Sequence, residues 1–137
     1  MFNTLKMTNN HQKEIQSKLT KGLLDMIVLQ LLEQEPMHGY QLIRKIRKDF
    51  GVCVGVSTVY PLLDTLEKNG CLKSEWNMNS ERPRKIFTLT NEGSTILNFS
   101  EASLNLIRKN LSGDNRVSFE AADVNTNGSR RPGIAIH

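Results

Sequence analysis

The chain has 137 residues, of which 38% are hydrophobic and 6% aromatic, and 18 Lys and Arg against 14 Asp and Glu give a net charge of +4. This size suits one domain with a modest core, and the mild positive charge permits an acidic partner without requiring one. No apolar run approaches the roughly 20 residues that cross a bilayer, the polar N-terminus lacks the apolar core of a signal peptide, and two cysteines make no disulfide framework. We therefore expect a cytoplasmic protein.

Residues 1–17 are polar and show no sustained hydrophobic period, which predicts a flexible or partly helical arm. From Leu19 onward the apolar residues recur at the spacing of a helix with one buried face: Leu23, Leu24, Ile27, Val28, Leu31 and Leu32. Thr20 is a suitable N-cap for this helix. The helix should end before Pro36, because the residue that precedes a proline is pushed out of the α region.

A second helix is predicted to begin at His38–Gly39 and to end at Gly51, a typical C-terminal stop signal. Its inner face is apolar, and its outer face carries four cations: Arg44, Lys45, Arg47 and Lys48. A third helix is predicted from Ser57 or Thr58 to Asn69–Gly70. With Thr58 as the cap, Pro61 would lie in the first turn, where its missing N–H costs nothing.

Two extended stretches follow, at residues 72–77 and 85–90, and a turn rich in Asn and Ser joins them. A fourth helix is predicted from Thr90–Asn91 to about Leu111, whereas residues 113–137 combine many turn formers with no period, which predicts disorder. This order of elements predicts a mainly α protein with a small antiparallel β-ribbon, a winged helix-turn-helix at residues 18–90 and a dimerisation helix at 91–112. In such a fold the third helix enters the DNA major groove, and the ribbon lies along the backbone or in the minor groove.

The predicted turn of the ribbon is cationic, because Arg82, Arg84 and Lys85 crowd around Pro83. Three interpretations are open: a nucleic-acid contact, an anionic small-molecule site, or a solvated turn without a role. Arginine binds phosphate through two N–H groups and is favoured in a narrow minor groove. Because the turn follows a helix-turn-helix pattern, the sequence favours the nucleic-acid contact.

The outer face of the third helix offers small hydroxyls and a phenol near its N-terminus: Ser57, Thr58, Tyr60 and Pro61, followed by Asp64 and Thr65. Hydroxyls at a helix N-terminus donate to phosphate oxygens, and the positive end of the helix dipole favours anions there. The alternative interpretation is that the hydroxyls only cap the helix and that Tyr60 belongs to the core.

The fourth helix carries more apolar surface than one small domain needs, and part of it follows a short heptad pattern: Ile96, Leu97, Leu104, Ile107 and Leu111. This predicts a homodimer joined through this helix, with packing inside the domain as the alternative.

The histidines His11, His38 and His137 are far apart, neither cysteine belongs to a C-x-x-C pair, and there is no glycine-rich phosphate loop. The sequence therefore predicts no enzyme, no cofactor and no metal site.

Three stretches, residues 19–46, 57–70 and 74–93, resemble the PadR family of prokaryotic transcriptional regulators, in its shorter subgroup with one C-terminal helix. The motifs that carry the resemblance are PMHGY at 36–40, TVYPLL at 58–63 and RPRK at 82–85. The resemblance implies a winged-helix homodimer, usually a repressor, that binds an inverted-repeat operator and in some members is released by a small-molecule effector. It also implies that residues 57–61 face the major groove, that residues 82–85 form the wing, and that three residues face the DNA backbone: Tyr40, Gln41 and Arg44.

The predicted function is therefore a sequence-specific DNA-binding transcriptional regulator that represses as a homodimer on a pseudo-palindromic operator. Its partners would be double-stranded DNA and a second copy of the chain, with a small-molecule effector as in some relatives. The alternative is a winged helix used for protein–protein contact without specific DNA binding. Asp64 and the modest net charge keep that alternative open, because many PadR proteins carry arginine at the positions of Asp64 and Thr65.

Overall fold

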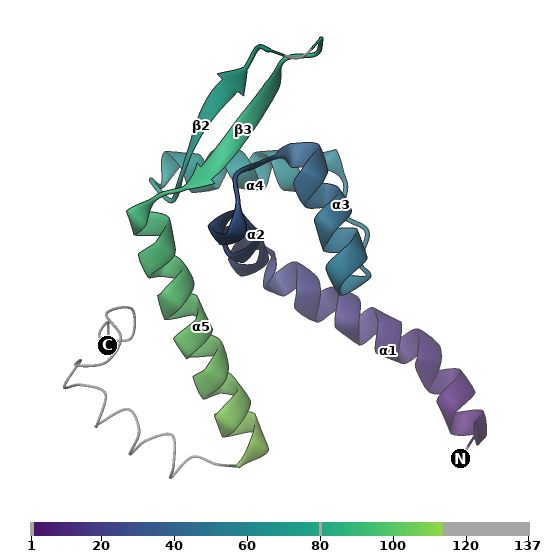
Figure 1. Ribbon diagram of the computed structural model, residues 1–137. Helices are drawn as coiled ribbons and strands as arrows, with labels where there is room; N and C mark the ends of the chain where they lie inside the picture. Colours follow the sequence, from purple (N-terminus) through teal and green to yellow (C-terminus); the bar gives the residue numbers. More distant parts are fainter. Residues whose placement is uncertain (1, 80, 114–137) are drawn as a thin grey trace, which may run out of the picture.

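The computed structural model describes residues 2–79 and 81–113, and the predicted disordered tail lies, apart from Gly113, outside the described residues. The elements in chain order are α1 (Phe2–Gly22), α2 (Leu24–Gln34), β1 (Met37–His38), α3 (Gly39–Phe50), α4 (Val56–Lys68), β2 (Leu72–Asn77), β3 (Arg84–Leu89) and α5 (Asn91–Ser112). The predicted fold class is confirmed: the protein is mainly helical, and one small antiparallel sheet projects from the helices (Figure 1). Within this part of the chain, no helix is long and apolar enough to cross a membrane.

The sheet has three strands in the order β1-β3-β2, and both pairings are antiparallel. The predicted ribbon is present with Leu72 opposite Leu89 and Asn77 opposite Arg84; we call residues 72–89 the wing. The short strand β1 was not predicted, because two residues are too few to show a period. By pairing His38 with Ile86, it joins the start of α3 to the base of the wing.

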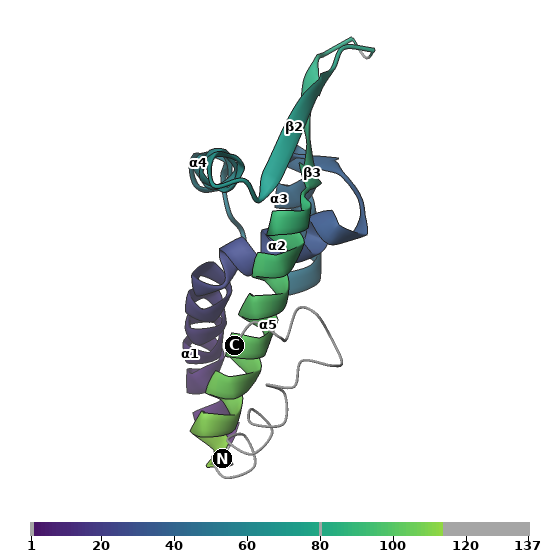
Figure 2. The same ribbon diagram turned by 90° about the vertical axis from the view of Figure 1, so that its left-hand side faces the viewer.

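The core lies where the apolar stripes of the helices meet the sheet. Its fully buried side chains are Val28, Leu29, Leu31, Leu42, Ile46, Val59, Leu63, Phe87 and Leu97. Helix α5 packs against α2, and the buried residues of α5, Gly93 and Leu97, lie in its first part. The free ends of α1 and α5 extend from one side of this core, and the wing extends from the opposite side (Figures 1 and 2).

The N-cap predicted at Thr20 is not present. Residues 2–22 form the continuous helix α1, and Thr20 is a buried residue within it, so Thr20 does not cap the helix that follows. The break between α1 and α2 falls at Leu23, which has no side-chain capping bond. Residues 2–17 carry no sustained apolar stripe, so the hydrophobic pattern gave no signal for α1.

Helix α4 begins earlier than predicted, at Val56, with Gly55 as its N-cap, so Thr58 lies inside the helix. Pro61 is consequently the sixth residue, past the first turn, and proline has no N–H to give to the carbonyl of Ser57. The helix continues because Val59, Leu63 and Leu66 are buried in the core. The predicted start of α5 is confirmed: the Thr90 side chain accepts a hydrogen bond from the Gly93 N–H at 3.0 Å.

Candidate nucleic-acid interface

The start of α3 is fixed by a reciprocal pair of hydrogen bonds. The Gln41 N–H donates to His38 Nδ1 at 3.3 Å, and the His38 N–H donates to Gln41 Oε1 at 3.0 Å. This capping box confirms the predicted helix start at His38–Gly39. Gly51 then ends the helix in the left-handed conformation, with φ of 69°. Tyr40 and Gln41 thus lie in the first turn, at the positive end of the helix dipole.

Tyr60 of α4 lies directly against the backbone of Gly39 of α3. A Cβ atom on Gly39 would stand only 2.5 Å from the Tyr60 Cζ atom, so the ring occupies space that any side chain would need. The ring of Tyr40 meets that of Tyr60 edge to face, with 6.4 Å between centroids. Burial raises the pKa of the Tyr60 hydroxyl, the charge of Tyr40 adds to this, and that of Arg84 opposes it. Both rings are partly exposed, Tyr40 by 51% and Tyr60 by 36%.

Arg84 joins the same cluster from the wing. It is half-buried at the first position of β3, and its Nη1 atom lies 3.0 Å from His38 Nε2. Burial lowers the pKa of His38, and the charges of Arg84 and Arg44 lower it further, which favours the neutral ring. A neutral imidazole has only one acceptor nitrogen. The ring therefore cannot accept hydrogen bonds from Gln41 and from Arg84 in the same tautomer, and the two contacts compete.

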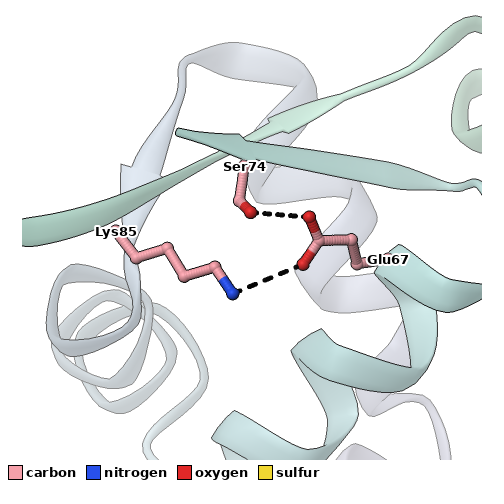
Figure 3. Close-up of polar contacts among 3 residues, drawn as sticks. All are labelled: Glu67, Ser74 and Lys85. Carbon is pink, nitrogen blue, oxygen red and sulfur yellow. Dashed lines mark hydrogen bonds and ion pairs between the residues drawn. The ribbon is translucent and has the colours of Figure 1, made fainter. Parts of the chain in front are cut away.

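Lys85 points back toward α4, away from the predicted cationic tip. Its Nζ atom lies 3.6 Å from Glu67 Oε1, while the Ser74 hydroxyl donates to Glu67 Oε2 at 2.6 Å (Figure 3). The same Nζ lies 5.6 Å from the centroid of the Phe87 ring. One carboxylate on the last turn of α4 thus holds both strands, so it fixes the angle between the wing and α4.

The predicted tip residues are therefore spread over the hairpin. Arg82 lies exposed in the turn, whereas Arg84 and Lys85 belong to β3, where neighbouring side chains face opposite sides of the ribbon. This corrects the expectation that all three cations gather at the turn, because strand pairing extends back to Arg84. On α4, the exposed side chains include those predicted to face outward: Ser57, Thr58, Pro61, Asp64 and Thr65.

An open groove of about 750 Å³ follows α3, and it is mainly cationic. Its lining consists of Glu35, Met37, Gln41, Arg44, Lys45, Arg47 and Lys48. Lys45 also pairs with Asp49 on its own helix, at 3.5 Å. The four cations were expected on the outer face, but the groove was not, because Glu35 and Met37 come from the segment before the helix. The described residues contain no cluster of His, Cys, Asp and Glu that would hold a metal ion.

The predicted dimerisation residues of α5 divide into two groups. Leu97 is fully buried in the core of its own chain, so its assignment to the dimer face is wrong; the first part of α5 packs on α2 and turns Leu97 inward. Leu104 is half-buried. The remaining three are exposed: Ile96 by 45%, Ile107 by 54% and Leu111 by 84%. Phe99 and Leu106 add to this exposed apolar surface, with 48% and 46% exposed.

The fold and this cluster at the junction of two helices and a β-ribbon define a winged helix-turn-helix protein. The model of the transcriptional regulator PadR-like family matches residues 28–99, which is more than half of the chain. The chain therefore belongs to the PadR-like family, whose members are transcription factors and not enzymes.

Solved structures of this family are similar to the chain. A PadR family transcriptional regulator from Eggerthella lenta shares 31% sequence identity with a TM-score of 0.69, over 79% of this chain and 95% of that one. A PadR-like transcriptional regulator from Bacillus cereus is 26% identical with a TM-score of 0.62, over 71% of this chain and 95% of that one. A PadR family transcription regulator from Clostridium difficile is 25% identical with a TM-score of 0.60, over 66% and 96%. No curated protein matches this chain.

Proposed function

We propose that this regulator is a repressor that acts as a homodimer on a pseudo-palindromic operator. The observation that supports this most directly is the junction of α3, α4 and the wing. Tyr60 packs on Gly39, Arg84 contacts His38, and Lys85 pairs with Glu67. These contacts hold a groove-reading helix, a helix N-terminus and a β-ribbon in one fixed arrangement, as DNA recognition by a winged helix requires.

Each part of the junction has its own role in this proposal. The exposed start of α4 reads the major groove with Ser57, Thr58, Tyr60 and Pro61. The start of α3 contacts the DNA backbone through Tyr40, Gln41 and Arg44, and the wing contacts it through Arg82 and Arg84. Lys85 acts indirectly, because its pairing with Glu67 positions the wing.

Arg84 is suited to a phosphate contact that forms only on DNA. In the free protein Arg84 needs His38 Nε2 as its acceptor and the Gln41 N–H needs His38 Nδ1. The two contacts compete, because a neutral imidazole has only one acceptor nitrogen. When a phosphate takes the guanidinium, the imidazole is free to accept the full capping bond of α3. Binding would therefore relieve a conflict within the protein while adding a charge-assisted hydrogen bond to DNA.

The dimer in this proposal forms through the exposed part of α5, with Ile96, Leu104, Ile107 and Leu111 facing the partner. This surface lies away from the wing, so a pair can join there and leave both wings open (Figure 1). Two α4 helices would then lie about one DNA turn apart, roughly 34 Å, which requires a two-fold symmetric site. A small-molecule effector would bind between the apolar faces of the two α5 helices.

The proposal is tested with duplex DNA from upstream of the protein's own gene and a scrambled duplex of equal length. We expect tighter binding to the upstream duplex in fluorescence anisotropy, and a steep loss of affinity when salt is raised, because phosphate contacts release counterions. Light scattering should give the mass of two chains. Ile107→Glu should reduce that mass to one chain, because it places a charge in the proposed apolar interface. Equal affinity for the two duplexes, or a single-chain mass for the unmodified protein, would refute the proposal.

A further inference from the structure

Trp76 is exposed on the wing, although tryptophan usually has a partner for its large ring. The side chain is 62% exposed, and it is the only tryptophan of the 137 residues. Tryptophan is one of the residues that contribute most to binding interfaces, because its broad ring buries much surface with little loss of conformational freedom. An exposed indole on a functional element is therefore a candidate contact residue.

The strand register places Trp76 on the side of the wing that faces α4. Trp76 stands opposite Lys85, and Ser74 stands opposite Phe87, so these four side chains share one face of the ribbon. Ser74 and Lys85 both reach Glu67 of α4 from that face (Figure 3). Figure 2 views α4 along its axis, with the wing rising beside it. Trp76 thus follows Ser74 along this face, two residues closer to the turn.

The charges around the indole favour a polyanion as its partner. Lys85 lies directly across the strand pair, and Arg82 follows in the turn of the same hairpin, whereas Arg84 faces the other side of the ribbon. The nearby carboxylate of Glu67 is already neutralised by Lys85 and bonded by Ser74. Glu75 pairs with Ile86 and faces the other side of the ribbon. An apolar ring bordered by cations suits the sugars and phosphates of nucleic acid better than it suits a neutral protein surface.

From this placement we infer that Trp76 is a DNA-contacting residue, whose indole packs against the deoxyriboses of the groove that the wing reaches. This inference rests on the proposed function, since it needs a duplex bound against α4. Apolar side chains of many minor-groove-binding proteins enter that groove and are buried there. The contact buries apolar surface and neutralises no phosphate, which separates it from the arginine contacts.

The first test uses the unmodified protein and the fluorescence of its one tryptophan. As upstream duplex is added, the emission should shift to shorter wavelength and acrylamide should quench it less, with the same midpoint as the anisotropy of labelled duplex. If anisotropy reports binding while emission and quenching stay unchanged, the Trp76 contact is refuted and the proposed function stands. If anisotropy reports no binding, both proposals fail.

The second test compares variants at several salt concentrations. Trp76→Ala should weaken binding about tenfold, the scale of exposing part of one large apolar side chain, and should leave the slope of log affinity against log salt unchanged. Trp76→Phe should recover most of the affinity, because it keeps an aromatic ring. Circular dichroism melts of both variants serve as the control for loss of folding. Wild-type affinity of Trp76→Ala, or a slope reduced as by loss of a cation, would overturn the inference.

Discussion

We expect Gly39→Ala to weaken DNA binding while it leaves the free energy of unfolding almost unchanged. The added Cβ would stand 2.5 Å from Tyr60 Cζ and 2.6 Å from its hydroxyl oxygen. An ordinary carbon contact needs about 3.5 Å, so the ring must retreat by about 1 Å or rotate outward. The atoms that must move are the far end of a side chain that is 36% exposed, so the ring can move without disturbing the core.

The two effects of this substitution on folding nearly cancel. Replacing glycine by alanine lowers the conformational entropy of the unfolded chain, which stabilises the fold by about 0.4–1 kcal/mol, and loss of the Tyr60 contacts costs a similar amount, about 0.5–1.5 kcal/mol. The free energy of unfolding should therefore change by less than about 1 kcal/mol. DNA affinity should fall about tenfold, because displacing the Tyr60 ring would disturb Tyr60 and its neighbour Tyr40, the two rings that we propose contact DNA.

Chemical denaturation and anisotropy on Gly39→Ala measure the two quantities. Gly22→Ala is the matched control, since a Cβ there meets no atom within 4 Å and the site lies at the end of α1. A double-mutant cycle completes the test: in a Tyr60→Ala background, Gly39→Ala should cost no further DNA affinity. The reasoning would be refuted if Gly39→Ala cost as much without the Tyr60 ring as with it.

Three further substitutions test other parts of the junction. Arg84→Ala should weaken binding to every duplex and lower the salt slope by about one, because it removes one of the proposed phosphate contacts. Glu67→Ala removes a negative charge, which alone would strengthen DNA binding, yet we expect weaker binding because both strands of the wing lose their anchor. For His38, burial and two arginines hold the pKa below its ordinary value of 6.5. The unfolded chain therefore takes up the proton first as the pH falls below that value, and stability present at neutral pH is lost. His38→Asn keeps a capping side chain but should remove this part of the pH dependence.

Each of these expectations has a result that contradicts it. An unchanged salt slope for Arg84→Ala in anisotropy titrations would show that its guanidinium binds no phosphate. Tighter binding by Glu67→Ala would mean that charge outweighs positioning at the wing. Thermal melts at pH 7.5 and 5.5 test His38, and an equal drop in melting temperature for the variant and the unmodified chain would assign the pH dependence to other groups.

The local sequence was sufficient to predict where most elements begin and end. The start of α3 at His38–Gly39, its stop at Gly51 and the cap of α5 at Thr90 were all predicted within a residue. Caps and stops depend on one residue and the backbone groups within one turn of it, so the information is present in a few neighbouring letters. The order of elements then limited the fold to a winged helix.

Contacts between distant residues were decided only by the tertiary structure. Arg84 and His38 are 46 residues apart, and Lys85 meets Glu67 only because the ribbon folds back over α4. Neither contact can be predicted from the hydrophobic pattern or the caps of a single helix or strand. The two-residue strand β1 exists for the same reason, since its partner is β3.

Leu97 and Leu104 show most clearly what the hydrophobic pattern of a helix cannot predict. They are seven residues apart on one face of α5 and are equivalent in any hydrophobic period. Leu97 lies within the part of the helix that α2 covers and is fully buried, while Leu104 keeps part of its surface exposed. The sequence determined which face of α5 is apolar. Only the tertiary structure determines how many residues along that face are buried, because this depends on which residues of α5 lie against the core of the same chain.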